Sequence, residues 1–184
     1  MNPFTPSPLE LETFLTPQRV TILQIISIAI ALSPLSFLFV IVILTSGSVP
    51  DEITNTQHLE TLQSLSLVTV ALCMASYSLL PVIPKILSRK NEPQRDLSER
   101  LNDAAELEKV FKAYLSKHVV TLAMFEFPAI FGMVVCLIGA MNGVLSSNPL
   151  YWYNIIPAGI LLVYVALTFP TKERILTTIR QRFH

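Results

Sequence analysis

The sequence predicts an all-α, polytopic membrane protein with four transmembrane helices. Of its 184 residues, 52% are hydrophobic and only 14% are charged, and the mean hydropathy is +0.56, far from the values of an average soluble domain. Four nearly uncharged segments are each long enough to cross the roughly 30 Å hydrocarbon core of a lipid bilayer as a helix. They are residues 20–44, 62–83, 118–141 and 150–169. Because little chain lies outside them, we expect a single domain over residues 1–184.

The distribution of basic residues predicts the orientation of these helices. All 13 Lys and Arg residues precede the first segment, lie between the second and the third, or follow the fourth. In membrane proteins the cytoplasmic loops carry the excess of Lys and Arg. We therefore expect both termini and the middle connection in the cytoplasm, and the connections 47–59 and 142–149 on the other side.

The first two segments are expected to be simple spanning helices joined by an outer loop. A short surface helix is expected before residue 20, because two Ser-Pro or Thr-Pro pairs form helix-start signals there. Gly47 and Pro50 break the helical pattern between the two segments. The Ser, Thr and Gln side chains within both segments can hydrogen-bond between helices, and we expect them mainly to support packing.

The third segment continues a cytoplasmic helix that we expect over residues 96–117. The stretch from Asp96 to Glu99 has the pattern of a capping box, and apolar residues then recur at helical spacing. One unbroken helix is therefore predicted from residue 96 to residue 141. The apolar stripe on its cytoplasmic part needs cover from the membrane surface, from neighbouring parts of the chain or from another subunit.

Small residues follow one side of the third segment, namely Ala129, Gly132, Cys136 and Gly143. These positions fall within a narrow arc of a helix, so another helix can approach closely. Such a face serves either packing inside one bundle or contact between two copies of the chain. We favour packing inside one bundle.

The fourth segment begins and ends with signals of the membrane interface. Tyr151, Trp152 and Tyr153 form an aromatic belt where the helix enters the membrane. After Pro170, residues 171–184 are predicted to form an amphipathic C-terminal helix, with apolar residues on one face and Lys and Arg on the other. We expect this tail to lie on anionic lipid.

Glu126 is a carboxylic acid deep within the third segment. It lies about 12 Å in from the cytoplasmic end, at about 1.5 Å per residue, too deep for its carboxylate to reach the lipid headgroups. We therefore expect a protonated carboxyl that is hydrogen-bonded to a neighbouring helix. The candidate partners at a similar depth are Ser27, Ser76, Tyr77 and Tyr164. Pro128 removes a backbone donor, so we also expect a kink beside Glu126.

No sequence pattern indicates an enzyme. The chain contains no Gly-rich phosphate loop, nucleotide fingerprint, nucleophile elbow or zinc-ligand spacing. Its three His residues are His58, His118 and His184, and the predicted topology does not allow two of them to bracket one haem. We expect no catalytic residue, cofactor, metal ion or nucleic acid partner.

The residues around Glu126, 123–135, resemble the carboxylate-bearing helix of the rotary ATPase proteolipid (c) subunits. In those subunits a lone membrane carboxylate is followed by small and aromatic residues and a glycine, as in the stretch from Glu126 to Gly132. The resemblance implies that Glu126 is a reversible proton carrier. It is a local similarity, because the proteolipid hairpin packs on a Gly-rich helix and none of the five Gly residues falls in the first two segments.

A wider pattern resembles a group of small four-helix bacterial inner-membrane proteins of unassigned function. Its parts are Gln24 before a span that contains Pro34, the basic middle connection, the Glu126 motif and the motif Phe-Pro-Thr-Lys-Glu-Arg that ends at Arg174. This resemblance implies a bacterial inner membrane and an accessory or structural role. Two hypotheses remain. The chain is a scaffold or accessory subunit in a homo-oligomer or larger membrane complex, or alternatively a proton or ion conduit that uses Glu126.

Overall fold

The computed structural model describes residues 12–47, 56–82 and 103–183, and every regular element in these ranges is a helix. The elements are α2 (Pro17–Gly47), α3 (Thr56–Leu79), α5 (Asp103–Met141), α6 (Val144–Ser147), the 3₁₀ helix η1 (Pro149–Ile155), α7 (Ile156–Thr168) and α8 (Lys172–Phe183). Four helical stretches are long and apolar enough to cross a membrane: Pro17–Gly47, Gln57–Leu79, Leu107–Met141 and Pro149–Thr168. The expectation of an all-α protein with four spanning helices is confirmed.

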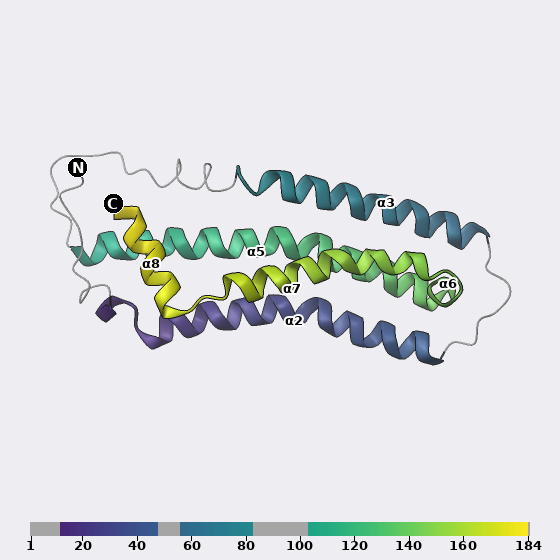
Figure 1. Cartoon of the computed structure of the whole chain (residues 1–184), viewed down its shortest axis with the longest axis horizontal. Helices are drawn as coiled ribbons and strands as arrows, with labels where there is room; N and C mark the ends of the chain where they lie inside the picture. Colours follow the sequence, from purple (N-terminus) through teal and green to yellow (C-terminus); the bar gives the residue numbers. More distant parts are fainter. Residues whose placement is uncertain (1–11, 48–55, 83–102, 184) are drawn as a thin grey trace.

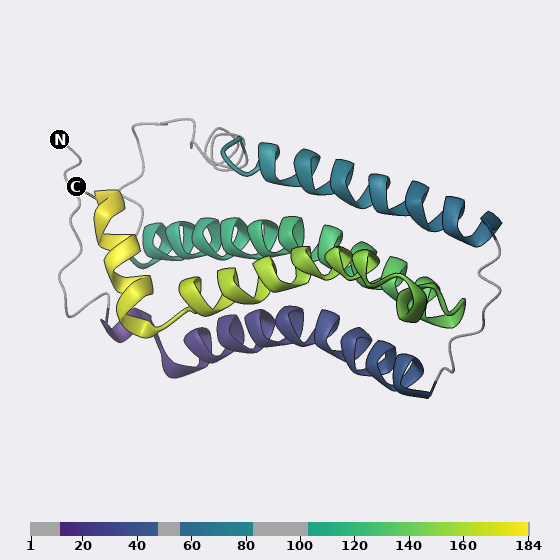
Figure 2. The same ribbon diagram turned by 45° about the vertical axis from the view of Figure 1, so that its right-hand side comes forward.

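The long helix α5 lies at the centre of the bundle (Figures 1 and 2). It packs against α2, α3 and α7, whereas α2 and α3 lie on opposite sides of it and hardly touch each other. Helices α2 and α5 run in the same direction along the bundle, and α3 and α7 run in the opposite direction (Figure 1). Helix α5 is therefore the element that joins the other three spanning stretches.

The helix ends follow from a few residues. Pro17 stands at the first position of α2, where its missing N–H costs nothing, and Gly47 stands at the last. Helix α3 begins earlier than expected, at Thr56, because no Gly or Pro interrupts the chain before residue 62. It ends at Leu79, just before Pro81, which cannot donate a helical hydrogen bond.

The helix α5 continues without interruption from Asp103 through Pro128 to Met141. The predicted start at residue 96 lies outside the described residues. A kink at Pro128 stays a prediction. Helix α2 also contains a proline, the buried Pro34 near its middle, and this helix curves along its length in both views (Figures 1 and 2).

Two hydrophobic clusters hold the helices together. The larger one runs along the spanning part of the bundle, and its most deeply buried large residues are Ile41, Leu62, Leu122, Met133, Val135, Leu145 and Leu161. The smaller one lies where α5, α8 and the start of α2 meet, and it contains Leu15, Val20, Leu23, Leu107, Phe111, Ile175 and Ile179. The second cluster covers the apolar stripe at the beginning of α5 with other parts of the same chain.

The position of α8 differs from the expected one. Ile175 and Ile179 on its apolar face are only 0% and 1% exposed, because they pack into the smaller cluster. The chain before α8 is fixed by the amide of Gln24, which donates to the carbonyl of Pro170 at 3.2 Å. The apolar face that we expected to lie on lipid is therefore covered by protein.

Candidate functional site

Two ionisable side chains of α5 face serines of α2. The Nε2 atom of His118 lies 3.0 Å from the hydroxyl oxygen of Ser27. Two turns further along, the side chain of Ser33 lies close to the half-buried carboxyl of Glu126. Glu126 follows His118 by eight positions, which corresponds to about 12 Å along the helix. Because α2 and α5 run in the same direction, the two polar pairs lie one after the other along a single interface.

The Ser27 hydroxyl has two possible partners. Its oxygen lies 2.9 Å from the carbonyl oxygen of Leu23 in the same helix and 3.0 Å from Nε2 of His118. Which of Ser27 and His118 donates to the other depends on the tautomer of the imidazole. The ring of Tyr114 stacks on the imidazole, with 6.1 Å between the ring centroids.

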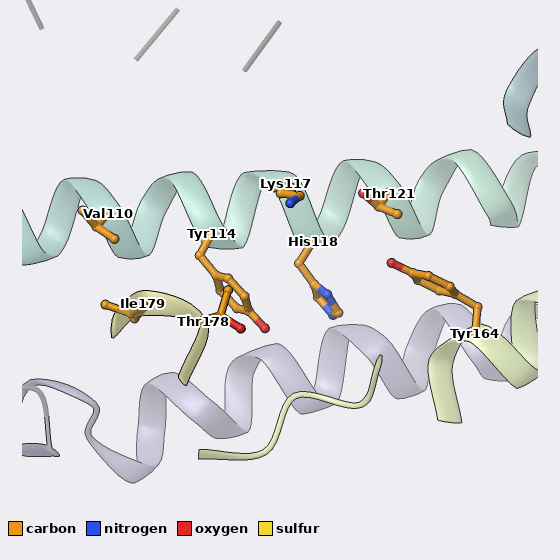
Figure 3. A pocket seen from close by; sticks show the side chains of 8 residues that line it. All are labelled: Val110, Tyr114, Lys117, His118, Thr121, Tyr164, Thr178 and Ile179. Carbon is orange, nitrogen blue, oxygen red and sulfur yellow. The ribbon is translucent and has the colours of Figure 1, made fainter. Parts of the chain in front are cut away.

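His118 also borders two adjoining cavities between α5, α7 and α8. Their volumes are about 180 Å³ and about 500 Å³, and both are lined by Tyr114, His118 and Thr178. Figure 3 shows Tyr114 and His118 extending from α5, and Tyr164 from α7, toward the same space. Polar groups of α5, α7 and α8 therefore line the space beside His118, the residue that pairs with Ser27.

The residues that we expected around Glu126 occupy other positions. Ser27 pairs with His118, and Ser76 is buried on α3. Tyr77 and Tyr164 both pack on Phe125, the residue before Glu126, with ring centroids 5.3 Å and 4.3 Å away. The Tyr77 hydroxyl is buried without a conventional hydrogen-bond partner and faces the thiol of Cys73. None of these four is the recorded partner of Glu126.

Ser33 is the partner that the sequence argument missed. Ser27 is level with His118, at the start of the third predicted segment, although Ser27 lies well inside the first predicted segment. Ser33 comes six residues later, about 9 Å further along the helix, and reaches the level of Glu126. The signal that could have found it is the Ser33-Pro34 pair, since the buried Pro34 marks the side of α2 that faces the bundle.

Asn154 is a second functional candidate that the sequence argument missed. It is fully buried where η1 meets α7, and its amide nitrogen donates to the Ser66 hydroxyl and to the Tyr151 carbonyl, both at 3.0 Å. Its side-chain oxygen has no partner among the described residues. In the sequence, Asn154 directly follows the aromatic belt. A strongly polar residue at the edge of an apolar span is the signal that could have identified it.

The small residues of α5 lie against η1 of the same chain. A Cβ atom added to Gly132 would be 2.2 Å from the backbone carbonyl oxygen of Asn154. Ala129 and Cys136 are both fully buried, and the Cys136 sulfur is 3.8 Å from the Tyr151 carbonyl oxygen. Gly143 does not belong to this face. It lies beyond the end of α5, has a left-handed φ of 69°, and has open space around it.

Comparison of the chain with protein families, with curated proteins and with solved structures found no match. Within the described ranges, no group of three or more His, Cys, Asp and Glu residues could hold a metal ion, and Cys73 and Cys136 are both free. The two polar pairs contain two ionisable groups, the imidazole of His118 and the carboxyl of Glu126.

Proposed function

We propose that the chain is a membrane scaffold or accessory subunit that acts through contacts between transmembrane helices. The supporting observation is the open arrangement of the bundle. In their most apolar stretches, 17% of α2 and 22% of α3 are buried, against 50% of α5. In an ordinary four-helix bundle each helix packs on two neighbours. Helix α2 packs on α5 and α7, whereas α3 packs on α5 and only touches η1, so much of the surface of α3 is free for a helix of another copy or another subunit.

The groove beside α3 gives such a helix a place to pack. An apolar groove of about 380 Å³ lies between α3 and the segment formed by η1 and α7, and its lining includes Val70, Met74, Ile156 and Ile160. Helix association in membranes depends on close packing because lipid already satisfies apolar surface. A groove that admits side chains supports association more than a smooth apolar helix does.

Cysteine cross-linking in the native membrane tests the scaffold role. In a background without Cys73 and Cys136, a cysteine replaces Met74 of α3, which is 71% exposed. The matched control is Leu167→Cys on α7, which is 67% exposed but lies away from the groove. We expect a defined cross-linked species for the α3 variant and none for the control. Equal cross-linking at both positions, or a monomeric mass in mild detergent without any co-purifying protein, would contradict the proposal.

A second candidate function is a proton or ion conduit that uses Glu126. It is favoured by the Ser33–Glu126 pair and by the Ser27–His118 pair that lies between Glu126 and the cavities. Protons would reach Glu126 from the cavity end of the bundle. Proton flux measured in reconstituted vesicles, with Glu126→Gln as the variant that cannot exchange a proton, tests this function.

We further propose a bacterial inner membrane as the location, with both termini and the beginning of α5 in the cytoplasm and without enzymatic activity. The one-sided distribution of Lys and Arg supports this orientation. Contact between the tail and anionic lipid would use exposed basic residues of α8, such as Lys172, because the apolar face is packed on α5 and α2.

A further inference from the structure

The two cavities between α5, α7 and α8 form one polar cleft, because they share Tyr114, His118 and Thr178. The cleft lies where α7 ends at Thr168 and where α5 emerges from its apolar stretch. This is the level at which lipid headgroups meet a transmembrane bundle.

Hydrogen-bond donors dominate the lining of the cleft. Lys117 contributes an ammonium group from α5, and Arg174 contributes a guanidinium group from α8. The guanidinium donates to the carbonyl of Leu167, which leaves further N–H groups of its five for a ligand. The phenol of Tyr114 is a third donor. The opposite charge in the lining is Glu173, an exposed residue.

The remaining hydroxyls of α8 in the cleft are already used as donors. Thr178 donates to the carbonyl of Arg174 at 2.8 Å, and Thr177 donates to the carbonyl of Glu173 at 2.9 Å. Their protons are therefore not available to a ligand, and the charged or phenolic donors that remain for it are those of Lys117, Arg174 and Tyr114. A phosphate, which only accepts, matches a lining with one cationic donor from α5 and one from α8.

An apolar path leads away from the cleft along α7. Leu167 lines the cleft and is 67% exposed, and Val163, one turn further into the membrane, is 58% exposed. Acyl chains attached to a phosphate in the cleft can lie along these side chains. A free phosphate ion gains nothing from this surface.

We propose that the cleft binds the phosphate headgroup of an anionic membrane lipid, with Lys117 and Arg174 as the charged contacts and the exposed apolar side of α7 beneath the acyl chains. The bound lipid joins α8 to the ends of α5 and α7. This inference does not depend on the scaffold role. It deepens the proposed contact between the tail and anionic lipid by placing the headgroup in a cleft and not on the outer side of α8.

A lipid titration of the full chain in non-ionic detergent tests the inference. Thermal unfolding is followed while phosphatidylglycerol, phosphatidylcholine or inorganic phosphate is added at equal concentration. We expect phosphatidylglycerol alone to raise the midpoint. Lys117→Gln should weaken its apparent affinity by about tenfold, because one charge-assisted hydrogen bond is lost, and Tyr114→Phe should weaken it less.

Lys172→Gln is the matched control, since it removes the same charge from the first position of α8 but does not line the cleft. A loss confined to the control would mean that lipid adsorbs to the outer side of the tail, which would overturn the cleft site and leave the tail contact intact. Equal losses in both variants, or no effect of phosphatidylglycerol, would also overturn it. If inorganic phosphate gave the same shift with the same dependence on Lys117, the ligand would be a free anion and not a lipid.

Discussion

The hydroxyl oxygen of Ser27 and the Nε2 atom of His118 are 3.0 Å apart and join α2 to α5 near one end of the bundle. Ser27 is 1% exposed and His118 is 8% exposed, so the contact is buried. The imidazole of His118 therefore depends on one serine of another helix for a buried hydrogen bond.

Replacement of that serine should destabilise the bundle. In Ser27→Ala the Nε2 atom of His118 loses its buried hydrogen-bond partner, which costs about 1–3 kcal/mol. Ser36→Ala is the control, since Ser36 is exposed and its hydroxyl bonds only to the carbonyl of Ser33 in its own helix. Unfolding in detergent by a graded denaturant measures both variants. Equal stability of the two would show that the Ser27–His118 pair contributes nothing.

The Ser33–Glu126 pair separates the two proposed functions. Glu126→Gln keeps the size and the hydrogen bond of the side chain, whereas Glu126→Leu leaves Ser33 without its partner. For a structural carboxyl we expect normal assembly and function with Gln and a loss of stability with Leu. For a proton carrier we expect normal assembly with Gln but no proton flux, because the amide cannot exchange a proton.

A double-mutant cycle verifies that these effects pass through Ser33. The variants Ser33→Ala, Glu126→Leu and their combination are compared by their free energies of unfolding. If the two side chains interact, the double variant costs less than the sum of the single variants. Strict additivity would indicate that the carboxyl has another partner or is bound to water.

Gly132 should be the least replaceable glycine of the described chain. In Gly132→Ala the new methyl group would meet the Asn154 carbonyl oxygen at 2.2 Å, so η1 must move away from α5, at a cost of about 1–3 kcal/mol. Gly159→Ala provides the opposite control, because Gly159 lies in α7 with nothing within 4 Å of the added atom. There alanine should be neutral or stabilising by up to about 1 kcal/mol. Thermal unfolding of both variants in one detergent measures the difference.

The orientation of the bundle can be measured by labelling from one side of the membrane. In a background without native cysteines, Ser147→Cys, an exposed position of α6, should react with a membrane-impermeant maleimide in intact cells. Thr177→Cys, an exposed position of α8, should react only after permeabilisation. The reverse pattern would show that the orientation derived from the basic residues is wrong.

The spanning helices could be predicted because a run of apolar residues is recognised from the sequence alone. Length and hydropathy locate the spans at 20–44 and 118–141 without any knowledge of neighbours, and the structure places α2 and α5 over them. Which side chains meet across helices depends on relative depth, and an offset of a few residues moves a partner by more than one turn. For this reason the argument for Glu126 gave Ser27 where the structure has Ser33.

The buried face of α8 and the position of Asn154 could not be predicted for a related reason. An amphipathic helix has the same pattern whether its apolar face meets lipid or protein, and only the apolar stripe around Leu107 and Phe111 on α5 decides between them. Asn154 is buried because the backbone of η1 lies close to Gly132 of α5. No local pattern in the sequence indicates how closely these two elements approach each other.

The docking of α8 on protein gives the last prediction, which distinguishes protein contact from lipid contact. A helix that is held by the bundle should stay protected in detergent, where no bilayer is present, so trypsin should cleave the wild-type chain slowly at the basic residues of α8. Ile175→Asp should expose these sites, because a buried carboxylate at a residue that is 0% exposed cannot remain in the smaller cluster. Thr177→Asp, at an exposed position of the same helix, should leave protection unchanged. Rapid cleavage of the wild-type chain in detergent, together with protection in vesicles, would instead show that lipid and not α5 holds this helix.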